Sequence, residues 1–296
     1  MNNCFGIDIS YFQRGINLKK CKEEGVEFVI IRASFTNSKK EFKKDSTFEI
    51  HYNNAKENDL EVGVYHYSKA CSYEEGRQEA INLYNNCLIN KKFEYPICMD
   101  VEDECQANAG KERITDAIKG FCETLENLGY YVCVYANINY IENYMDYKEL
   151  KKLYDFWIAL WNKKEPNLEK YNYGIWQFGG EINKIRSNKI AGFVCDQNYS
   201  YKQYKDIMIN NCLNGYHKVD NEEDKISIGD KVIIKGAYAS SSKSLIAIHT
   251  AKTGSECYVT NIYRGTRFPY QLGVKKDNIS SKYTIGFANE NSIIKK

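Results

Sequence analysis

Eight short runs of β-branched and aromatic residues alternate with polar, helix-like segments over the first two-thirds of this chain of 296 residues. Such alternation is typical of parallel strands joined by right-handed helical crossovers. Eight strands of this kind close on themselves. We therefore predict an α/β fold, an irregular (β/α) barrel of eight strands, with a doubly wound open sheet as the alternative. The predicted strands are Phe5–Ser10, Glu27–Ser34, Glu61–Ser68, Tyr95–Glu102, Tyr130–Ile138, Phe156–Asn162, Tyr173–Gly180 and Ala191–Asn198.

The segments between these strands show the 3.6-residue periodicity of amphipathic helices. After the sixth strand the connections are shorter and less helical, so we expect the last helices of the barrel to be reduced. The predicted helices are Leu18–Glu24, Ser46–Asn58, Tyr73–Cys87, Lys111–Leu128 and Asn139–Leu153, followed by Glu165–Tyr171.

The end of the chain has a different character. Residues 210–224 are polar and rich in turn-forming residues, and short strand-like runs separated by Gly, Ser and Asn follow them. We predict a barrel over residues 1–209, a linker over 210–224 and a small all-β SH3-like domain over 225–296. Its strand-like runs are Lys231–Lys235, Leu245–His249, Cys257–Tyr263, Tyr283–Phe287 and Ser292–Lys295.

Charge is unevenly distributed between these parts. Residues 225–296 hold 12 lysines and arginines against four acidic residues, so the remainder of the chain is net acidic. A basic module favours an anionic polymer as partner. No aromatic-interleaved RNA motif or major-groove helix is evident, and no apolar run has the roughly 18 residues of a membrane span. We expect neither nucleic acid nor membrane as a partner.

The eleven cysteines are scattered from Cys4 to Cys257 without a C-x-x-C motif or a Cys/His ligand spacing. We expect reduced, mostly buried thiols rather than a disulfide framework or a zinc site. No cofactor and no metal are expected. The N-terminus lacks the basic start and the apolar stretch of a secretory signal, so we expect synthesis in the cytoplasm.

Acidic residues fall near the ends of three predicted strands. Asp8 belongs to the first strand, Asp100 and Glu102 end the fourth, and Asp196 belongs to the eighth. Strand ends meet at one mouth of a barrel, and Asp100 and Glu102 project to the same side because side chains alternate. Crowded carboxylates retain protons, as the general acid of a glycosidase must. A divalent-metal site and ordinary helix capping or ion pairing are the alternatives.

Aromatic and hydrogen-bonding residues near the other strand ends suit a sugar, which presents apolar faces rimmed by hydroxyl groups. His66 is the histidine at a strand end, and we interpret it as a hydrogen-bonded wall residue rather than an acid or base. The candidate substrate-binding residues are Arg32, Ser34, Tyr65, His66, Tyr67, Tyr135, Trp161, Trp176 and Gln177.

Seven short motifs occur in order along residues 4–205: Phe5–Ser10, Ile31–Ser34, Gly63–Tyr67, Asp100–Glu102, Trp157–Ala159, Ile175–Phe178 and Asp196–Asn198. This succession resembles glycoside hydrolase family 25, the lysozymes or muramidases of bacteriophage endolysins and some bacteria. Two positions depart from the family pattern. Leu160-Trp161 replaces the tyrosine common after Trp-Ile-Ala, and Gln197 stands where a small apolar residue is usual.

The resemblance implies hydrolysis of the β-1,4 bond between N-acetylmuramic acid and N-acetylglucosamine in peptidoglycan. It implies Glu102 as general acid and Asp100 as the carboxylate that orients or stabilises the reacting group. Asp8 and Asp196 match the remaining acids of the pocket. The resemblance leaves the stereochemical course open among substrate-assisted retention, a direct Asp nucleophile and inversion.

The tail more loosely resembles bacterial SH3-like cell-wall-binding modules, in Gly229–Val232 followed by Gly236–Tyr238. The implied protein is an endolysin that reaches the bacterial wall after holin-type release. A non-catalytic cell-wall glycan-binding protein is the main alternative function. A metal-dependent hydrolase or peptidoglycan amidase is a further one.

Overall fold

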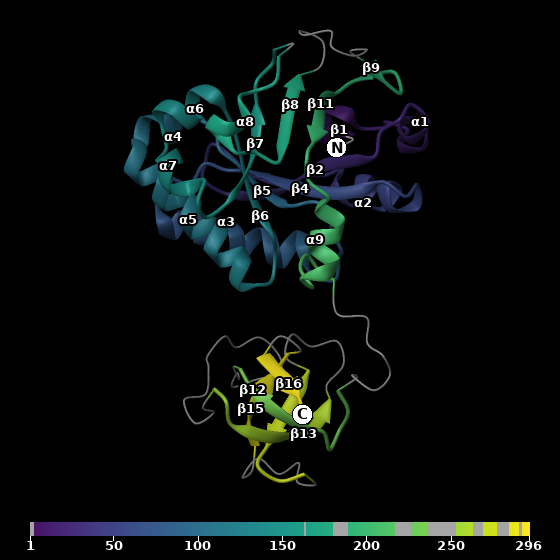
Figure 1. The fold of residues 1–296 in the computed structure, drawn as a ribbon, viewed down its shortest axis with the longest axis vertical. Coiled ribbons are helices and arrows are strands. Elements are labelled where there is room, and N and C mark those ends of the chain that lie inside the picture. Colours follow the sequence, from purple (N-terminus) through teal and green to yellow (C-terminus); the bar gives the residue numbers. More distant parts are fainter. Residues whose placement is uncertain are drawn as a thin grey trace. The chain divides into compact units, whose positions relative to one another are not determined.

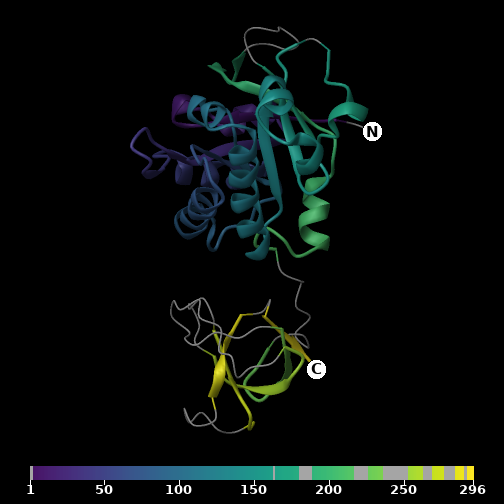
Figure 2. The ribbon, with the colours of Figure 1, turned by 90° about the vertical axis from the view of Figure 1, so that its left-hand side faces the viewer.

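The computed structural model describes residues 3–162, 164–179, 189–216, 226–235, 253–262, 269–276, 284–289 and 292–296. The chain divides into two compact units, Met1–Lys218 and Val219–Lys296. Figures 1 and 2 show the two units in views related by a quarter turn.

The first unit is built on a closed ring of eight strands. β1 pairs with β2 on one side and with β11 on the other, which closes the sheet, and the short β3 (Phe42–Lys44) extends β2 outside the ring. The closed barrel confirms the predicted fold class and excludes the open sheet. In ring order the strands are β1 (Cys4–Ile9), β2 (Phe28–Thr36), β4 (Glu61–Tyr67), β5 (Ile97–Asp100), β6 (Val132–Asn137), β7 (Asp155–Ala159), β8 (Ile175–Gly179) and β11 (Asp196–Ser200).

The last strand of the ring runs opposite to the direction that we predicted. β11 pairs antiparallel with both β1 and β8, whereas the other ring neighbours are parallel. A parallel strand would require a crossover of a dozen or more residues back to the far end of the barrel. The described part of the connection instead forms a hairpin of β9 (Lys189–Ile190) and β10 (Phe193–Val194). Asp196 therefore begins its strand, at the mouth where the parallel strands end.

Helices surround the ring outside β1 to β8 (Figure 1). The predicted segment 139–153 forms two short helices instead of one, and α3 continues into a π-helical turn over Tyr84–Leu88. Two helices were not predicted, α4 (Glu104–Ala109) and α9 (Tyr204–Asn210). The others are α1 (Leu18–Glu23), α2 (Phe48–Glu57), α3 (Tyr73–Leu83), α5 (Lys111–Asn127), α6 (Ile138–Asn143), α7 (Tyr147–Leu150) and α8 (Leu168–Tyr171), and a 3₁₀ turn follows β1 at Tyr11–Gln13.

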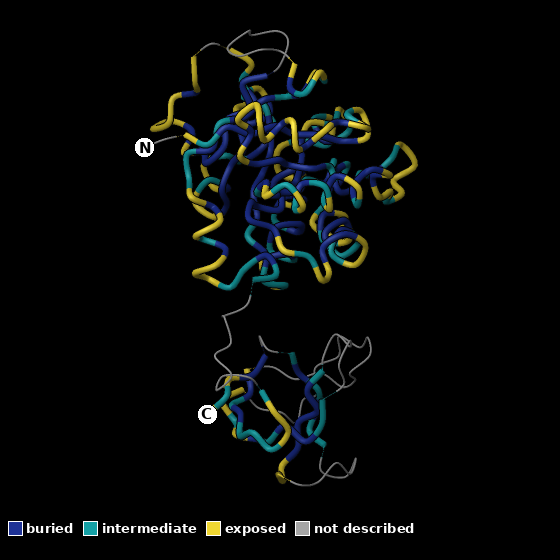
Figure 3. The backbone as a smooth tube through the Cα atoms, turned by 90° about the vertical axis from the view of Figure 1, so that its right-hand side faces the viewer, coloured by how far each residue is buried: buried dark blue, intermediate teal, exposed yellow. Residues whose placement is uncertain are grey.

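The alternation of side chains along each strand separates two apolar clusters. Figure 3 shows the buried residues in dark blue, most of them in the interior of the first unit. On β4, Val62 and Val64 pack in the cluster that also holds helix residues. Inside the ring, Phe28 stacks on Tyr95 with ring centroids 4.2 Å apart, and Trp157 belongs to the same inner cluster. The two clusters thus lie on opposite faces of the sheet, one outside the ring together with helix residues and one in the barrel interior.

The chain returns to the barrel after β11 instead of becoming a linker at once. α9 contributes Tyr204 and Met208 to the inner cluster. Beyond it, the Asn214 side chain accepts a hydrogen bond from the Tyr131 N–H at 2.8 Å and donates one to the Tyr95 carbonyl at 2.9 Å. The described part of the expected linker, residues 210–216, is therefore an ordered part of the first unit.

The second unit contains a five-stranded sheet in which all neighbours are antiparallel. Its core includes Val232, Val259 and Leu272. This confirms the prediction of a small all-β domain, while the predicted strand Leu245–His249 lies outside the described residues. In sheet order the strands are β15 (Thr284–Ala288), β14 (Tyr270–Gly273), β13 (Glu256–Ile262), β12 (Lys231–Ile234) and β16 (Ile293–Lys295).

Within the described residues, no helix combines the length and the apolar character that crossing a bilayer requires.

The close approach of α3 and α5 gives a test of the helix layer. A Cβ added at Gly76 would lie 2.0 Å from the Ala117 carbonyl oxygen, so the two helices must separate to accept it. Gly76→Ala should lower the free energy of unfolding by roughly 1–3 kcal/mol through overpacking, although alanine is the better helix former. Urea unfolding followed by circular dichroism measures this loss.

Gln78→Ala in the same helix is the matched control, because Gln78 is exposed. It should leave the unfolding midpoint almost unchanged. Equal midpoints for Gly76→Ala and the wild type would contradict the tight α3–α5 contact.

Candidate active site

Two carboxylates face each other where the barrel closes. Asp8 of β1 and Asp196 of β11 are register partners across the antiparallel pair. Residues directly opposite in such a pair have Cα atoms about 4.5–5.5 Å apart and project to the same face of the sheet. Asp8 is buried, whereas Asp196 is half-buried. The expected meeting of these residues is present, although Asp196 arrives on a strand of opposite direction.

The other two carboxylates come from the end of β5. Asp100 is its last residue and is only 5% exposed, while Glu102 lies two residues further on and is exposed. Alternation directs Asp100 and Glu102 to the barrel interior, and Val101 between them packs in the outer cluster. The four carboxylates predicted from the sequence therefore gather at one mouth of the barrel.

Crowding and burial raise the pKa of each of these acids. Burial, followed by repulsion from Asp196, raises the pKa of Asp8 to about 8. Burial raises the pKa of Asp100 well above its usual value, and Glu102 and Asp8 add repulsion. Although Glu102 is exposed, surrounding protein partly desolvates its carboxylate and raises its pKa, with further repulsion from Asp196 and Asp103. Burial also raises the pKa of Asp196. The cluster therefore holds protons that isolated carboxyl groups would release.

A network of amides fixes Asp8 in place. Its Oδ2 accepts hydrogen bonds from the Gln177 amide at 3.0 Å and from the Asn198 amide at 2.8 Å. The orientation of Gln177 is set in turn, because its Oε1 accepts from the Tyr135 hydroxyl at 3.0 Å and from the Trp161 indole N–H at 2.9 Å. Three of the candidate substrate-binding residues thus act in one chain of contacts that ends on Asp8.

Asp100 has a polar atom without a partner. Its Oδ1 is buried and accepts no hydrogen bond in the structure. Leaving such a group unpaired costs about 1–3 kcal/mol, and a bound donor would recover that energy. Asp100 therefore has an acceptor available for a group that enters the mouth.

A cationic side chain stands beside the acids, held by a residue that the sequence analysis missed. Arg32 donates from Nε to Asp45 Oδ2 at 2.7 Å, and its charge lowers the pKa of Asp100 against the dominant effect of burial. The Arg32 guanidinium also lies 5.4 Å from the ring centroid of Phe12, which is 76% exposed. Phe12 and the 44% exposed Trp161 are apolar surfaces that a ligand can reach.

Two tyrosines of β4 share the inward face with the acids. Tyr65 packs edge-on against Trp157 at 6.1 Å, and burial together with Asp8 raises its pKa. The Tyr67 hydroxyl donates to Asp103 Oδ2 at 2.9 Å, next to Glu102 in the chain. These positions agree with the expected lining of the mouth.

Three candidate substrate-binding residues lie on the wrong face of their strands. Ser34 and His66 are fully buried and share a hydrogen bond of 2.8 Å, and the imidazole stacks against Phe121 of α5. Trp176 is 4% exposed in the outer cluster and donates its indole N–H to the Leu160 carbonyl. His66 and Trp176 are each offset by one residue from an inward-facing position. Ser34 lies two residues after the inward-facing Arg32, but the register of β2 against β4 shifts between these two residues and turns Ser34 outward.

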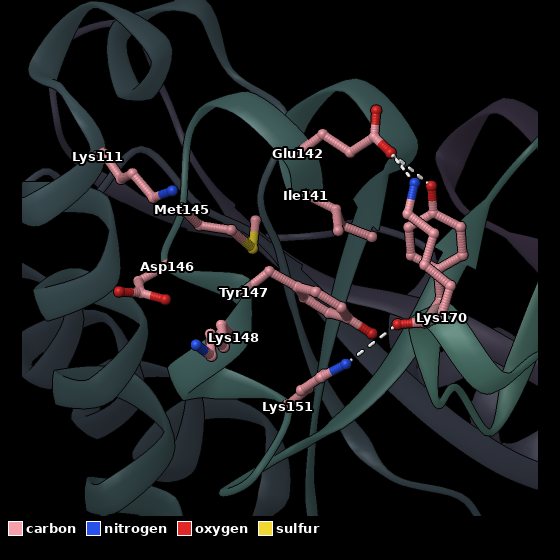
Figure 4. Close-up of a pocket in the computed structure, with 10 residues that line it drawn as sticks. Lys111, Ile141, Glu142, Met145, Asp146, Tyr147, Lys148, Lys151 and Lys170 are labelled. Carbon is pink, nitrogen blue, oxygen red and sulfur yellow. Dashed lines mark hydrogen bonds and ion pairs between the residues drawn. The ribbon is translucent and has the colours of Figure 1, made fainter.

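A pocket of about 440 Å³ lies elsewhere, where α6, α7 and α8 meet outside the ring (Figure 4). None of the four carboxylates lines it. Its charged groups are partly engaged with one another: Lys170 pairs with Glu142 at 2.6 Å, and Lys151 donates to the Lys170 carbonyl at 3.1 Å. Among the described residues, no group of three or more His, Cys, Asp or Glu side chains is arranged to hold a metal ion.

The family model for glycosyl hydrolases family 25 matches residues 7–185, which include Asp8, Asp100 and Glu102. The chain belongs to this family. The autolytic lysozyme of Clostridium acetobutylicum is 29% identical to this chain over 185 residues, 61% of this chain and 52% of that protein. The D-alanyl-L-alanine endopeptidase of Streptococcus phage B30 is 25% identical over 180 residues, 61% of this chain and 38% of that protein. The match thus spans about half or less of these relatives.

A solved structure shares the fold of this family 25 chain. The CTP1L endolysin is 21% identical with a TM-score of 0.56, over 76% of this chain and 71% of that one. At this identity the likeness concerns the fold alone, and it agrees with the closed barrel.

Two further residues that contact the candidate site were not among the predicted site residues. Asn198 lies two residues after Asp196, so strand alternation places it on the same face and would have identified it. Asp45 follows the short β3 and carries no such periodic signal. Its role depends on the tertiary contact with Arg32.

The raised pKa of Asp8 predicts a dependence of stability on pH. Between pH 4 and 8 the folded protein retains protons that the unfolded chain releases, so the free energy of unfolding should fall as pH rises through this range. Asp8→Asn removes one of these groups and should flatten the decline. Urea unfolding at a series of pH values measures both slopes.

Glu74→Gln is the matched control, because the hydrogen-bonded ion pair with Arg77 holds the pKa of Glu74 below its usual value and Glu74 lies outside the carboxylate cluster. That substitution should alter stability on the acid side, below about pH 4, and leave the slope between pH 4 and 8 intact. An unchanged slope for Asp8→Asn would show that Asp8 is ionised throughout this range.

Proposed function

We propose that this chain is a peptidoglycan muramidase of the endolysin or autolysin type, which hydrolyses the β-1,4 bond between N-acetylmuramic acid and N-acetylglucosamine. Membership of glycosyl hydrolases family 25 and a relative named as an autolytic lysozyme support the proposal. The observation that carries it is the cluster of four carboxylates with raised pKa values, one of which is exposed.

Glu102 is the proposed general acid. It is the exposed member of the cluster, so a glycosidic oxygen can reach it, and its raised pKa keeps a larger fraction protonated near neutral pH. A glycosidase needs such a proton at the leaving oxygen as the sugar takes on oxocarbenium character. Asp103 is less suited because Lys69, Tyr67 and the start of α4 engage its carboxylate.

Asp100 is the proposed partner of the reacting sugar. Its unpaired Oδ1 is available to accept the N–H of a 2-acetamido group, which would position that group for attack on the anomeric carbon. The same carboxylate in its ionised form would stabilise the developing cation directly. Asp8 and Asp196 complete the acidic environment. Retention and inversion both employ such carboxylates, and the anomer of the first product, read by NMR, distinguishes them.

The proposed sugar contacts are the inward-facing candidates Arg32, Tyr65, Tyr67, Tyr135, Trp161 and Gln177. Trp161 and the exposed Phe12 offer aromatic faces for the apolar side of a pyranose. Their positions near Gln177 and Arg32 place hydrogen-bond donors beside each platform.

The second unit is the proposed SH3-like wall-binding module. The basic residues of the tail favour an anionic wall polymer through attraction that salt weakens. The place of action is then the bacterial wall, reached by holin-type release from the host cytoplasm.

Glu102→Gln tests the assignment of the acid. It removes the transferable proton while retaining size, and hydrolysis of purified peptidoglycan should fall by about 100-fold or more. The release of reducing ends measures the rate, and mass spectrometry of the digest identifies the bond that is cut.

Glu104→Gln is the control, since Glu104 is exposed in the first turn of α4, two residues along the chain. It should retain hydrolysis. A Glu102→Gln protein that remains folded and clears walls at the wild-type rate would exclude Glu102 as the acid. Sedimentation of the wild type with walls without any new reducing ends would favour a glycan-binding protein instead.

Truncation after Lys218 tests the role of the second unit. The shortened chain should pellet less with purified walls and cleave soluble glycan fragments at an unchanged rate. Wild-type binding should also weaken when NaCl is raised, because ionic attraction is screened. Equal pelleting of the two proteins would remove wall binding from this unit.

A further inference from the structure

Two thiols meet beside the acid-bearing loop. Cys71 follows β4, Cys105 lies in the first turn of α4, and their Sγ atoms are 3.9 Å apart. Their positions in the chain are 34 residues apart, so the contact joins the loop after β4 to the start of α4. Both cysteines are free thiols in the structure.

The surroundings bring these sulfurs together. The Lys69 carbonyl oxygen lies 3.4 Å from Cys71 Sγ and 3.6 Å from Cys105 Sγ, so the two thiols converge on the same acceptor. The Lys40 ammonium lies 3.8 Å from Cys71 Sγ. A nearby cation stabilises a thiolate, which is the reactive form of cysteine.

The two thiols differ in reactivity and access. Burial and a hydrogen bond to Asp103 raise the pKa of Cys105 to about 12, so Cys105 is the poorer source of thiolate. Cys105 is half-buried, whereas Cys71 is 8% exposed. Cys105 is therefore the sulfur that solvent reaches more readily, and Cys71 lies within 3.9 Å of it to complete a disulfide.

We propose that Cys71 and Cys105 are a redox modification site that closes to a disulfide under oxidants. The two thiols give up two protons and two electrons to an electrophilic diazene such as diamide, which is reduced to the hydrazine, and one S–S bond forms. The sulfurs need to approach by about 2 Å to reach bonding distance. A dithiol reductant returns both hydrogens and reopens the bond.

The bond would join the loop after β4 to α4. α4 begins two residues after Glu102, and its N-cap Asp103 already contacts Tyr67 and Lys69 of the neighbouring strand and loop. A covalent link across the same gap restricts the unfolded chain and holds the segment that carries Glu102. The consequence for hydrolysis rests on the proposed function, whereas the formation of the bond does not.

The direct test uses the full-length wild-type protein. The native chain is treated with diamide, its remaining thiols are alkylated, and proteolytic peptides are analysed by mass spectrometry. The expected result is a linked pair of peptides that contain Cys71 and Cys105, which separates after treatment with dithiothreitol. Recovery of both peptides as separate alkylated species from the oxidised folded protein would overturn the proposal. So would linkage of either cysteine to a different partner.

A second readout compares thermal unfolding of the oxidised and reduced proteins. Oxidation should raise the Tm of the wild type by roughly 5 °C, because the link closes a long loop. Cys71→Ser should abolish this shift. Cys212→Ser, which removes another half-buried thiol, should keep it. A shift that persists in Cys71→Ser, or no shift where the linked peptides are found, would overturn the stabilising role.

Residual glycan hydrolysis after heating completes the comparison. The oxidised wild type should retain more activity than the reduced protein, and Cys71→Ser should show no such difference. If the wild type hydrolyses no glycan in either state, the proposed function fails while the peptide and Tm results still decide the redox site.

Discussion

The closure of the sheet between β1 and β11 is the contact on which the site depends. It places two carboxylates opposite each other, an arrangement that costs free energy when both are ionised. The structure relieves the cost in two ways. Amide donors from Gln177 and Asn198 bind Asp8, and the raised pKa values allow protons to neutralise part of the cluster. The repulsion between carboxylates where β1 meets β11 therefore also raises their pKa values, which keeps protons on the cluster at the mouth.

Most of the barrel could be predicted from hydrophobic periodicity. Each strand buries one face inside the ring and the other outside it, so the strands appear in the sequence as short apolar runs between amphipathic helices. The direction of β11 could not, since alternation of side chains reads the same in either direction along a strand. The error was harmless for Asp196, because an antiparallel strand begins where its parallel neighbours end. α9 was missed for a different reason. Its seven residues are too few to show a clear helical period, and it packs against the barrel through Tyr204 and Met208 in the inner cluster.

Site residues could be predicted where the alternation of side chains along a strand was used. They could not be predicted from residue type alone. Asp100 and Glu102 were assigned to one face by their spacing, and the structure places them so. Ser34, His66 and Trp176 were chosen as polar or aromatic groups at strand ends, yet all three pack outward. His66 and Trp176 lie one residue from inward-facing positions, whereas Ser34 is turned outward by the register shift after Arg32, which the sequence does not reveal. Asp45 lies outside the strands, so alternation makes no prediction for it. Its place in the site depends on its hydrogen bond with Arg32.

The antiparallel direction of β11 also determines where the chain leaves the barrel. β11 carries the chain from the mouth to α9, which lies at the other end of the ring in Figure 1, and Asn214 is bound there by the loops that precede β5 and β6. The chain thus leaves the barrel at the end opposite to the carboxylate cluster. A different sequence can therefore be joined at this point without a change in any loop that carries one of the four carboxylates.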